Sequence, residues 1–96
     1  MAVVMFMVDA LQYFEGMSKQ KVREVAFEIA ALGTQGIHPD GQYVLRTVPK
    51  KDFSGYHLLA YYYVSWAIAA PEMLKELKLP YDNEYQMAQT MHRTTK

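Results

Sequence analysis

Apolar residues recur every three to four positions along the first third of the chain, the spacing of one face of an α-helix. This pattern predicts a helix over residues 3–15, which Gly16 ends. A second helix is predicted over residues 19–32, because Ser18 is a good N-cap residue and apolar positions again share one face. We expect Gly33 to end this helix in the left-handed conformation.

The helical period is lost over residues 34–52, where glycine and proline are concentrated. Residues 42–48 follow a turn-forming segment and are rich in β-branched and aromatic side chains, so one short strand or hairpin is predicted there. A lone strand leaves its backbone groups without partners, so it must pair inside or outside the chain, and residues near Ile37 are a candidate partner.

The segment at about residues 54–69 is apolar or aromatic on every side, which is typical of a buried helix. We expect it to begin near Asp52 or Ser54, either of which could cap it. A short helix over residues 72–77 and a last helix over residues 83–91, capped by Asp82, complete the pattern. The sequence therefore predicts a mainly α fold, a compact bundle of four to five helices around the central apolar helix.

Composition limits the function classes. The chain has 96 residues, 51% of them apolar, so we expect one folded domain over residues 1–96. Ten basic residues balance ten acidic ones, and this absence of net charge argues against nucleic acid as a partner. The absence of cysteine excludes disulfides and thiolate metal sites and fits a cytoplasmic protein. No membrane is expected as a partner, because no uncharged stretch has the length of a span.

Catalytic and metal chemistry find little support. The three histidines, His38, His57 and His92, lack the spacing that places two ligands on one helical face, so no metal and no cofactor are expected. No catalytic residue is assigned. One alternative remains open: a ligand-binding or enzymatic pocket around His57, Tyr61 and Trp66, with Asp52 or His38 nearby, because His57 and Tyr61 stand four residues apart on the central helix.

The tripeptide His38-Pro39-Asp40 resembles the signature of the J-domain of Hsp40-type co-chaperones. The resemblance implies stimulation of an Hsp70 ATPase through these three residues. The family places a strongly basic helix before the motif and a packed helix after it, whereas here the preceding helix has mixed charge and a strand is predicted to follow. A turn is therefore the favoured interpretation of the tripeptide.

The apolar residues also exceed what so short a chain covers easily. A domain of this size buries only about 60–65% of the surface that its unfolded chain exposes. We therefore predict a non-catalytic interaction or scaffolding domain, either a homo-oligomer or packed on a preceding domain as the C-terminal part of a longer, bacterial-type protein. The residues expected at the interface come from the first and the central helix: Val4, Phe6, Met7, Tyr62 and Tyr63.

Overall fold

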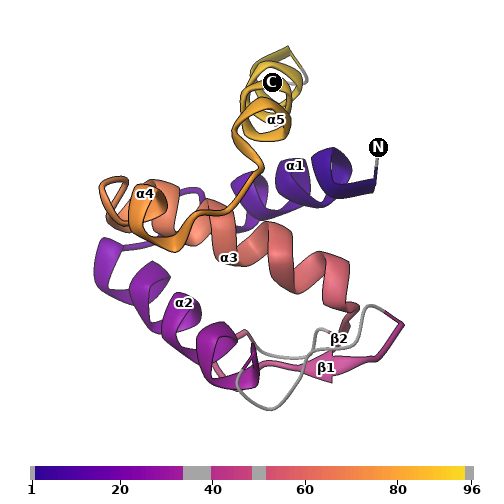
Figure 1. The fold of residues 1–96 in the computed structure, drawn as a ribbon, viewed down its shortest axis with the longest axis vertical. Helices are drawn as coiled ribbons and strands as arrows, with labels where there is room; N and C mark the ends of the chain where they lie inside the picture. The colour runs from indigo at the N-terminus through magenta and orange to yellow at the C-terminus, as the bar shows by residue number, and fades with distance from the viewer. Residues whose placement is uncertain (1, 34–39, 49–51, 95–96) are drawn as a thin grey trace.

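The computed structural model describes residues 2–33, 40–48 and 52–94 of the chain. Five helices and one small antiparallel hairpin make up this described part (Figure 1), which confirms the predicted mainly α bundle. In chain order the elements are α1 (Ala2–Phe14), α2 (Lys19–Gly33), β1 (Tyr43–Val44), β2 (Asp52–Phe53), α3 (Gly55–Ala69), α4 (Met73–Leu77) and α5 (Asp82–Thr94).

Helix α3 lies at the centre of the bundle, as its apolar sequence predicts. It packs against α1 on one side and α2 on another, and the hairpin lies near its N-terminal end (Figure 1). Helix α5 packs on α1, at the end of the molecule opposite α2 (Figure 1). Buried side chains lie all around α3, so this helix has no polar face.

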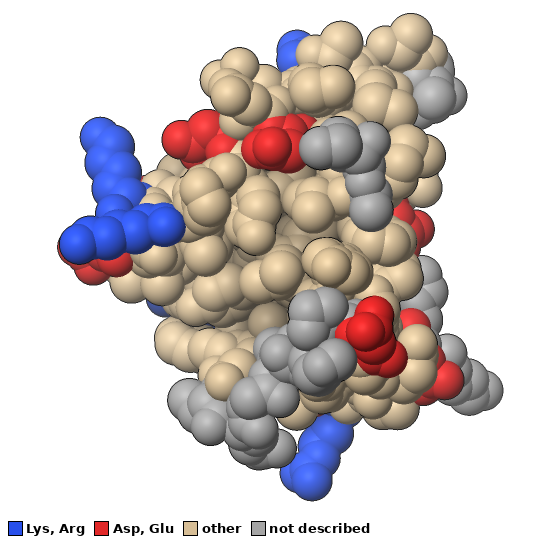
Figure 2. Space-filling model, turned by 45° about the vertical axis from the view of Figure 1, so that its right-hand side comes forward, with Lys and Arg blue, Asp and Glu red and all other residues tan. Residues whose placement is uncertain are grey.

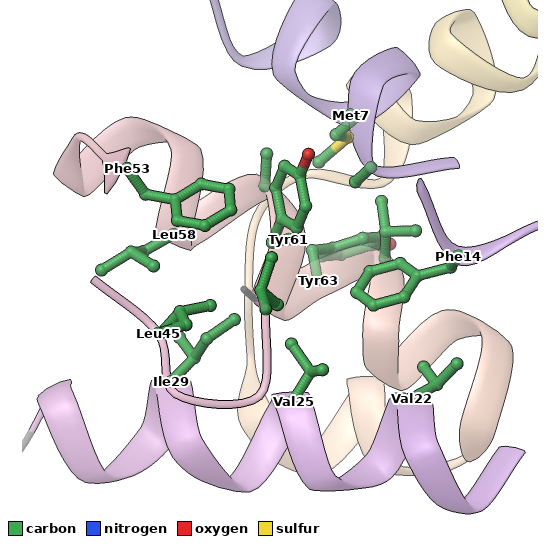
Figure 3. Close-up of a cluster of buried hydrophobic side chains, with 14 of the residues drawn as sticks. Met7, Phe14, Val22, Val25, Ile29, Leu45, Phe53, Leu58, Tyr61 and Tyr63 are labelled. Carbon is green, nitrogen blue, oxygen red and sulfur yellow. The ribbon is translucent and has the colours of Figure 1, made fainter. Parts of the chain in front are cut away.

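The core is built from side chains of α1, α2, α3 and the hairpin region. Figure 3 shows these side chains meeting between the helices. They are Met7, Phe14, Val22, Val25, Ile29, Leu45, Phe53, Leu58, Tyr61 and Tyr63. Two of the largest are tyrosines of α3, so the core includes polar hydroxyl groups that need hydrogen-bond partners.

The hairpin is shorter than the segment predicted over residues 42–48. Tyr43 and Val44 form β1, and they pair with Phe53 and Asp52 of β2. The candidate partner near Ile37 lies outside the described residues. Beyond Val44 the amides of Arg46 and Thr47 donate to the Glu28 carboxylate of α2, so they are not used in the strand ladder. Leu45, the residue after β1, is fully buried in the core.

One helix end differs from the expected glycine conformation. Gly33 is the last residue of α2 and does not adopt a positive φ, so its predicted left-handed conformation is wrong. The glycine with a left-handed backbone is Gly16, with a φ of 79°, in the turn between α1 and α2. Ser18 caps α2 as predicted, since its Oγ accepts a hydrogen bond of 3.1 Å from the Lys21 amide.

The Glu28 carboxylate of α2 tethers the segment after β1 through hydrogen bonds. It accepts hydrogen bonds from the Arg46 amide, from the Thr47 amide at 2.9 Å and from the Thr47 hydroxyl. Partial burial acts to raise the pKa of Glu28, but these hydrogen bonds and the positive charge of Arg46 outweigh it, so the pKa lies below its ordinary value. These hydrogen bonds hold in place the segment that contributes Leu45 and Val48 to the core.

Replacing Glu28 with glutamine is expected to lower the free energy of unfolding at about pH 7 by roughly 1 kcal/mol, because an amide keeps one acceptor oxygen but loses the charge. The folded pKa of Glu28 is depressed, so its contribution is present above the unfolded pKa and is lost as the pH falls through the folded value. Urea denaturation should therefore show the difference in stability from wild type shrinking toward about pH 3.

The matched variant Glu24→Gln, which loses only an exposed 3.7 Å ion pair with Lys21, should change stability by less than about 0.5 kcal/mol. A Glu28→Gln difference that stays constant with pH would contradict the assignment.

Candidate functional site

His57 takes a structural position at the start of α3. Its Nδ1 accepts a hydrogen bond of 3.2 Å from the Ser54 amide, while the Ser54 Oγ accepts one of 3.3 Å from the His57 amide. These reciprocal bonds form a capping box, with Ser54 as the N-cap residue of α3. The imidazole also packs on Phe6, with ring centroids 3.9 Å apart. Its place in the fold is thus explained by helix capping and ring packing.

Tyr61 lies one turn further along α3 and is fully buried. Its hydroxyl donates a hydrogen bond of 2.6 Å to the Asp9 carboxylate of α1, and its ring packs edge-on against Phe53 and Phe14. Burial, the hydrogen bond to Asp9 and the negative charge of Asp9 all raise the pKa of Tyr61. The hydroxyl therefore stays protonated and joins α1 to α3.

The structure does not bring Trp66 to His57 and Tyr61. Positions 61 and 66 of a helix are separated by about 140° of rotation, so their side chains leave α3 on different sides. Trp66 packs among Ala26, Ala70 and the residues of α4, away from the contacts of Tyr61. Of the two residues expected nearby, Asp52 lies exposed in β2 and His38 lies outside the described residues.

The residues expected at an interface separate into core and surface. Val4, Met7 and Tyr63 are buried in this chain's own core, where they are not accessible to another chain. The Tyr63 hydroxyl donates to the Asp82 carboxylate at the start of α5, which fixes it further. Phe6 and Tyr62 are half-buried, and Tyr62 lines a system of two apolar hollows.

That system is a groove between α2 and α3, which we call the α2–α3 groove. It consists of two adjoining hollows of about 290 Å³ and 430 Å³ that share Ala30 and Tyr62. The first is completed by the C-terminal end of α2, the N-terminal part of α3 and Leu79. The second is completed by the opposite ends of the two helices and by α4: Arg23, Phe27, Trp66, Ala70, Glu72, Met73 and Leu77.

The antiparallel packing of α2 and α3 creates the groove. Positions 23, 27, 30 and 33 form one row along α2, and positions 59, 62, 66 and 70 form the facing row along and just past α3. The ends of each row lie ten or eleven positions apart, so the groove is about 15 Å long at the helical rise of about 1.5 Å per residue. It is thus long enough for roughly three turns of a helix.

Three aromatic rings form the second hollow. Phe27 is 58% exposed, although its ring lies edge-on to Trp66 with centroids 5.5 Å apart. Tyr62 meets the same indole from α3 at 6.3 Å. Trp66 is only 5% exposed, and its indole nitrogen is buried without a hydrogen-bond partner among the described residues. In the groove the exposed Phe27 ring therefore lies against the buried indole of Trp66, which also contacts Tyr62.

The groove is almost free of charge. Among the described residues that line it, Arg23 and Glu72 alone are charged, both lie in the second hollow, and their charges are opposite. In the view of Figure 2, uncharged side chains cover most of the surface, acidic side chains lie in patches among them, and basic side chains project from the margins. The apolar lining of the groove gains free energy when an apolar partner covers it.

Sequence reasoning missed Phe27, Met73 and Leu77. The inner face predicted for α2 contained Val22, Val25 and Ile29, and these are indeed buried. Phe27 lies off that face, so the pattern gave it no role. The available signal was a large aromatic residue among the polar positions of an amphipathic helix. Exposing such a side chain to water is unfavourable, whereas exposing a polar side chain is not.

The described residues give no support for a metal site, a membrane-spanning helix or a J-domain motif. Over residues 2–33, 40–48 and 52–94, no three His, Asp or Glu side chains gather as a metal site would require. No helix in the same residues has both the length and the apolar character needed to cross a bilayer. Of the tripeptide that resembles the J-domain signature, Asp40 lies exposed in a turn, while His38 and Pro39 lie outside the described residues. Comparisons with protein families, with curated proteins and with solved structures found no match for this chain.

Proposed function

We propose that this chain is a non-catalytic helical protein-interaction domain whose binding surface is the α2–α3 groove. The observation that carries the proposal is the exposed Phe27 ring, held edge-on against Trp66 in a groove with almost no charge. A water-exposed aromatic ring beside a buried one is a typical binding hot spot, because a partner can desolvate it at little conformational cost.

The shape of the groove favours a helical segment as its occupant. An amphipathic helix can lie in an apolar groove and insert side chains from successive turns of one face. The two adjoining hollows supply neighbouring positions for two such side chains, and Tyr62 lies between them. Complete burial of Phe27 alone would contribute about 1.5–3 kcal/mol relative to its full exposure, and roughly half of that remains to be gained here.

A selection from a displayed library of helical peptides tests the proposal. We expect the selected peptides to share apolar residues spaced three or four positions apart, and to change the emission of Trp66, the sole tryptophan of the chain. Ala30→Lys places a charge where the two hollows meet, so it should weaken binding at least about tenfold.

The matched control is Ala31→Lys, which adds the same charge at the next position, outside the two hollows of the groove. It should leave peptide binding within about twofold of wild type. Circular dichroism would establish that both variants keep the helical content of the wild type. Selected peptides that bind wild type and Ala30→Lys equally well would overturn the groove as the binding surface.

A further inference from the structure

Helix α5 carries a second uncharged surface, on the side that faces away from the bundle. Met87 is 55% exposed and Met91 is 37% exposed, and the two stand one helical turn apart. They line a shallow hollow of about 510 Å³ together with Asn83, Gln86 and Thr90, none of which is charged. In the core of the bundle α5 buries only Ala88 completely. We call the pair Met87 and Met91 the α5 stripe.

We propose, building on the proposed function, that the occupant of the α2–α3 groove is a second copy of this chain, which inserts its α5 stripe. The groove would then receive a helix already present in every copy. The apolar side chains left exposed on α5 would be covered in the same contact. The spacing and the charge of the two surfaces support a second copy as the occupant.

The spacing of the stripe fits the groove. Residues four apart on a helix are separated by about 6 Å along its axis, so Met87 and Met91 can enter two adjacent hollows. The hollows of the groove are adjacent, because Ala30 and Tyr62 line both. Methionine is unbranched and polarisable, and it adapts to irregular apolar sites such as the cluster of Phe27, Tyr62 and Trp66.

The charges also favour self-association. The chain has a formal net charge of zero, so two copies approach without net repulsion. The stripe and its neighbours Asn83, Gln86 and Thr90 are uncharged, and the groove carries only one charge of each sign. A strongly basic or acidic partner would find no complementary surface in the groove, whereas an uncharged stripe loses little solvation on entering it.

The contact would join two different surfaces, which determines the kind of assembly. In Figure 1, α5 and α2 lie at opposite ends of the molecule, so the stripe of one copy meets the groove of another in a head-to-tail contact. Such contacts close into a ring where the rotation between copies permits it and otherwise extend into a chain. The assembly should therefore contain one groove contact per copy when it is closed.

The test is size-exclusion chromatography with light scattering over a range of protein concentrations. We expect the wild-type mass to rise above 11.1 kDa and the emission of Trp66 to change over the same concentrations. Ala30→Lys blocks the groove and Met87→Glu blocks the stripe, so each variant alone should remain a monomer to at least about tenfold higher concentration. The control Thr94→Glu adds the same charge to α5 at an exposed position outside the hollow lined by the stripe, and it should associate nearly as wild type does.

Mixing the two blocked variants gives the decisive result. Ala30→Lys keeps an intact stripe and Met87→Glu keeps an intact groove, so the mixture should form a two-chain complex although neither variant associates alone. If Met87→Glu fails to fold, as judged by circular dichroism, Met91→Glu takes its place. A mixture that stays monomeric, or a wild type that stays monomeric to about 1 mM, overturns the inference. The proposed function would survive that outcome if selected peptides still bind the groove and Ala30→Lys still prevents it.

Discussion

Replacing Tyr61 with alanine is expected to lower the free energy of unfolding by about 3–5 kcal/mol, the range for removing a buried aromatic side chain. The ring is fully buried and meets Phe53 at 4.8 Å and Phe14 at 5.7 Å between ring centroids. Its loss would leave a cavity where α1, α3 and the hairpin meet. Because small domains have only about 5–15 kcal/mol of stability, urea denaturation should show a large drop or an unfolded chain.

Two further variants separate the causes. Tyr61→Phe keeps the ring but leaves Asp9 without its hydrogen bond, so we expect a smaller loss of about 1–3 kcal/mol. Tyr56→Ala removes an exposed tyrosine from the same helix and should change stability by less than about 0.5 kcal/mol. A Tyr61→Ala variant as stable as Tyr56→Ala would show that the aromatic cluster does not hold the bundle together.

We expect the domain to lose stability in alkaline solution, because folding opposes the ionisation of its buried tyrosines. The pKa values of Tyr61 and Tyr63 are raised in the folded state by burial and by the hydrogen-bonded carboxylates of Asp9 and Asp82. A raised folded pKa means that the contribution of each tyrosine is complete below its unfolded value near 10 and is lost as the pH rises toward the folded value. Each phenol can cost up to about 1.4 kcal/mol per pH unit above that point.

Urea midpoints measured between about pH 8 and pH 11 check this expectation. The wild type should lose stability steeply above about pH 10, and Tyr63→Phe should lose it less steeply because one of the tyrosines with a raised pKa is gone. Tyr63→Phe is less stable at neutral pH, so the slope with pH is the quantity to compare. An equal slope in wild type and variant would show that Tyr63 ionises as freely in the folded chain as in the unfolded one.

The sequence predicted the helices well because each of their signals is local. Ser18 and Ser54 cap the helices that follow them, and the uniformly apolar segment after Ser54 is the central helix. The pairing of β1 with β2 was not predicted, because it depends on residues that lie eight or more positions away along the chain. A two-residue strand offers too short a pattern to identify its partner.

The candidate site was less predictable, because exposure depends on how helices pack against one another. Tyr61, Tyr62 and Tyr63 are consecutive and equally apolar in the sequence, yet Tyr61 and Tyr63 are buried and Tyr62 lines the groove. The sequence places the three rings in different directions, but only the positions of α1, α2 and α5 decide which direction is covered. His57 shows the same limit, since its partner Ser54 is a helix cap and not a reacting group.

The hydrogen bond from Tyr61 to Asp9 joins residues 52 positions apart, and this separation has a consequence during protein synthesis. Helix α1 emerges from the ribosome before α3, with Val4, Met7 and Phe14 on the face that the core later buries. At about 5–20 residues per second, the ribosome needs roughly 3–10 s to add the 52 residues that separate the two partners. For that interval the first helix must keep an apolar face in water, so the nascent chain is most prone to aggregation before its central helix has emerged.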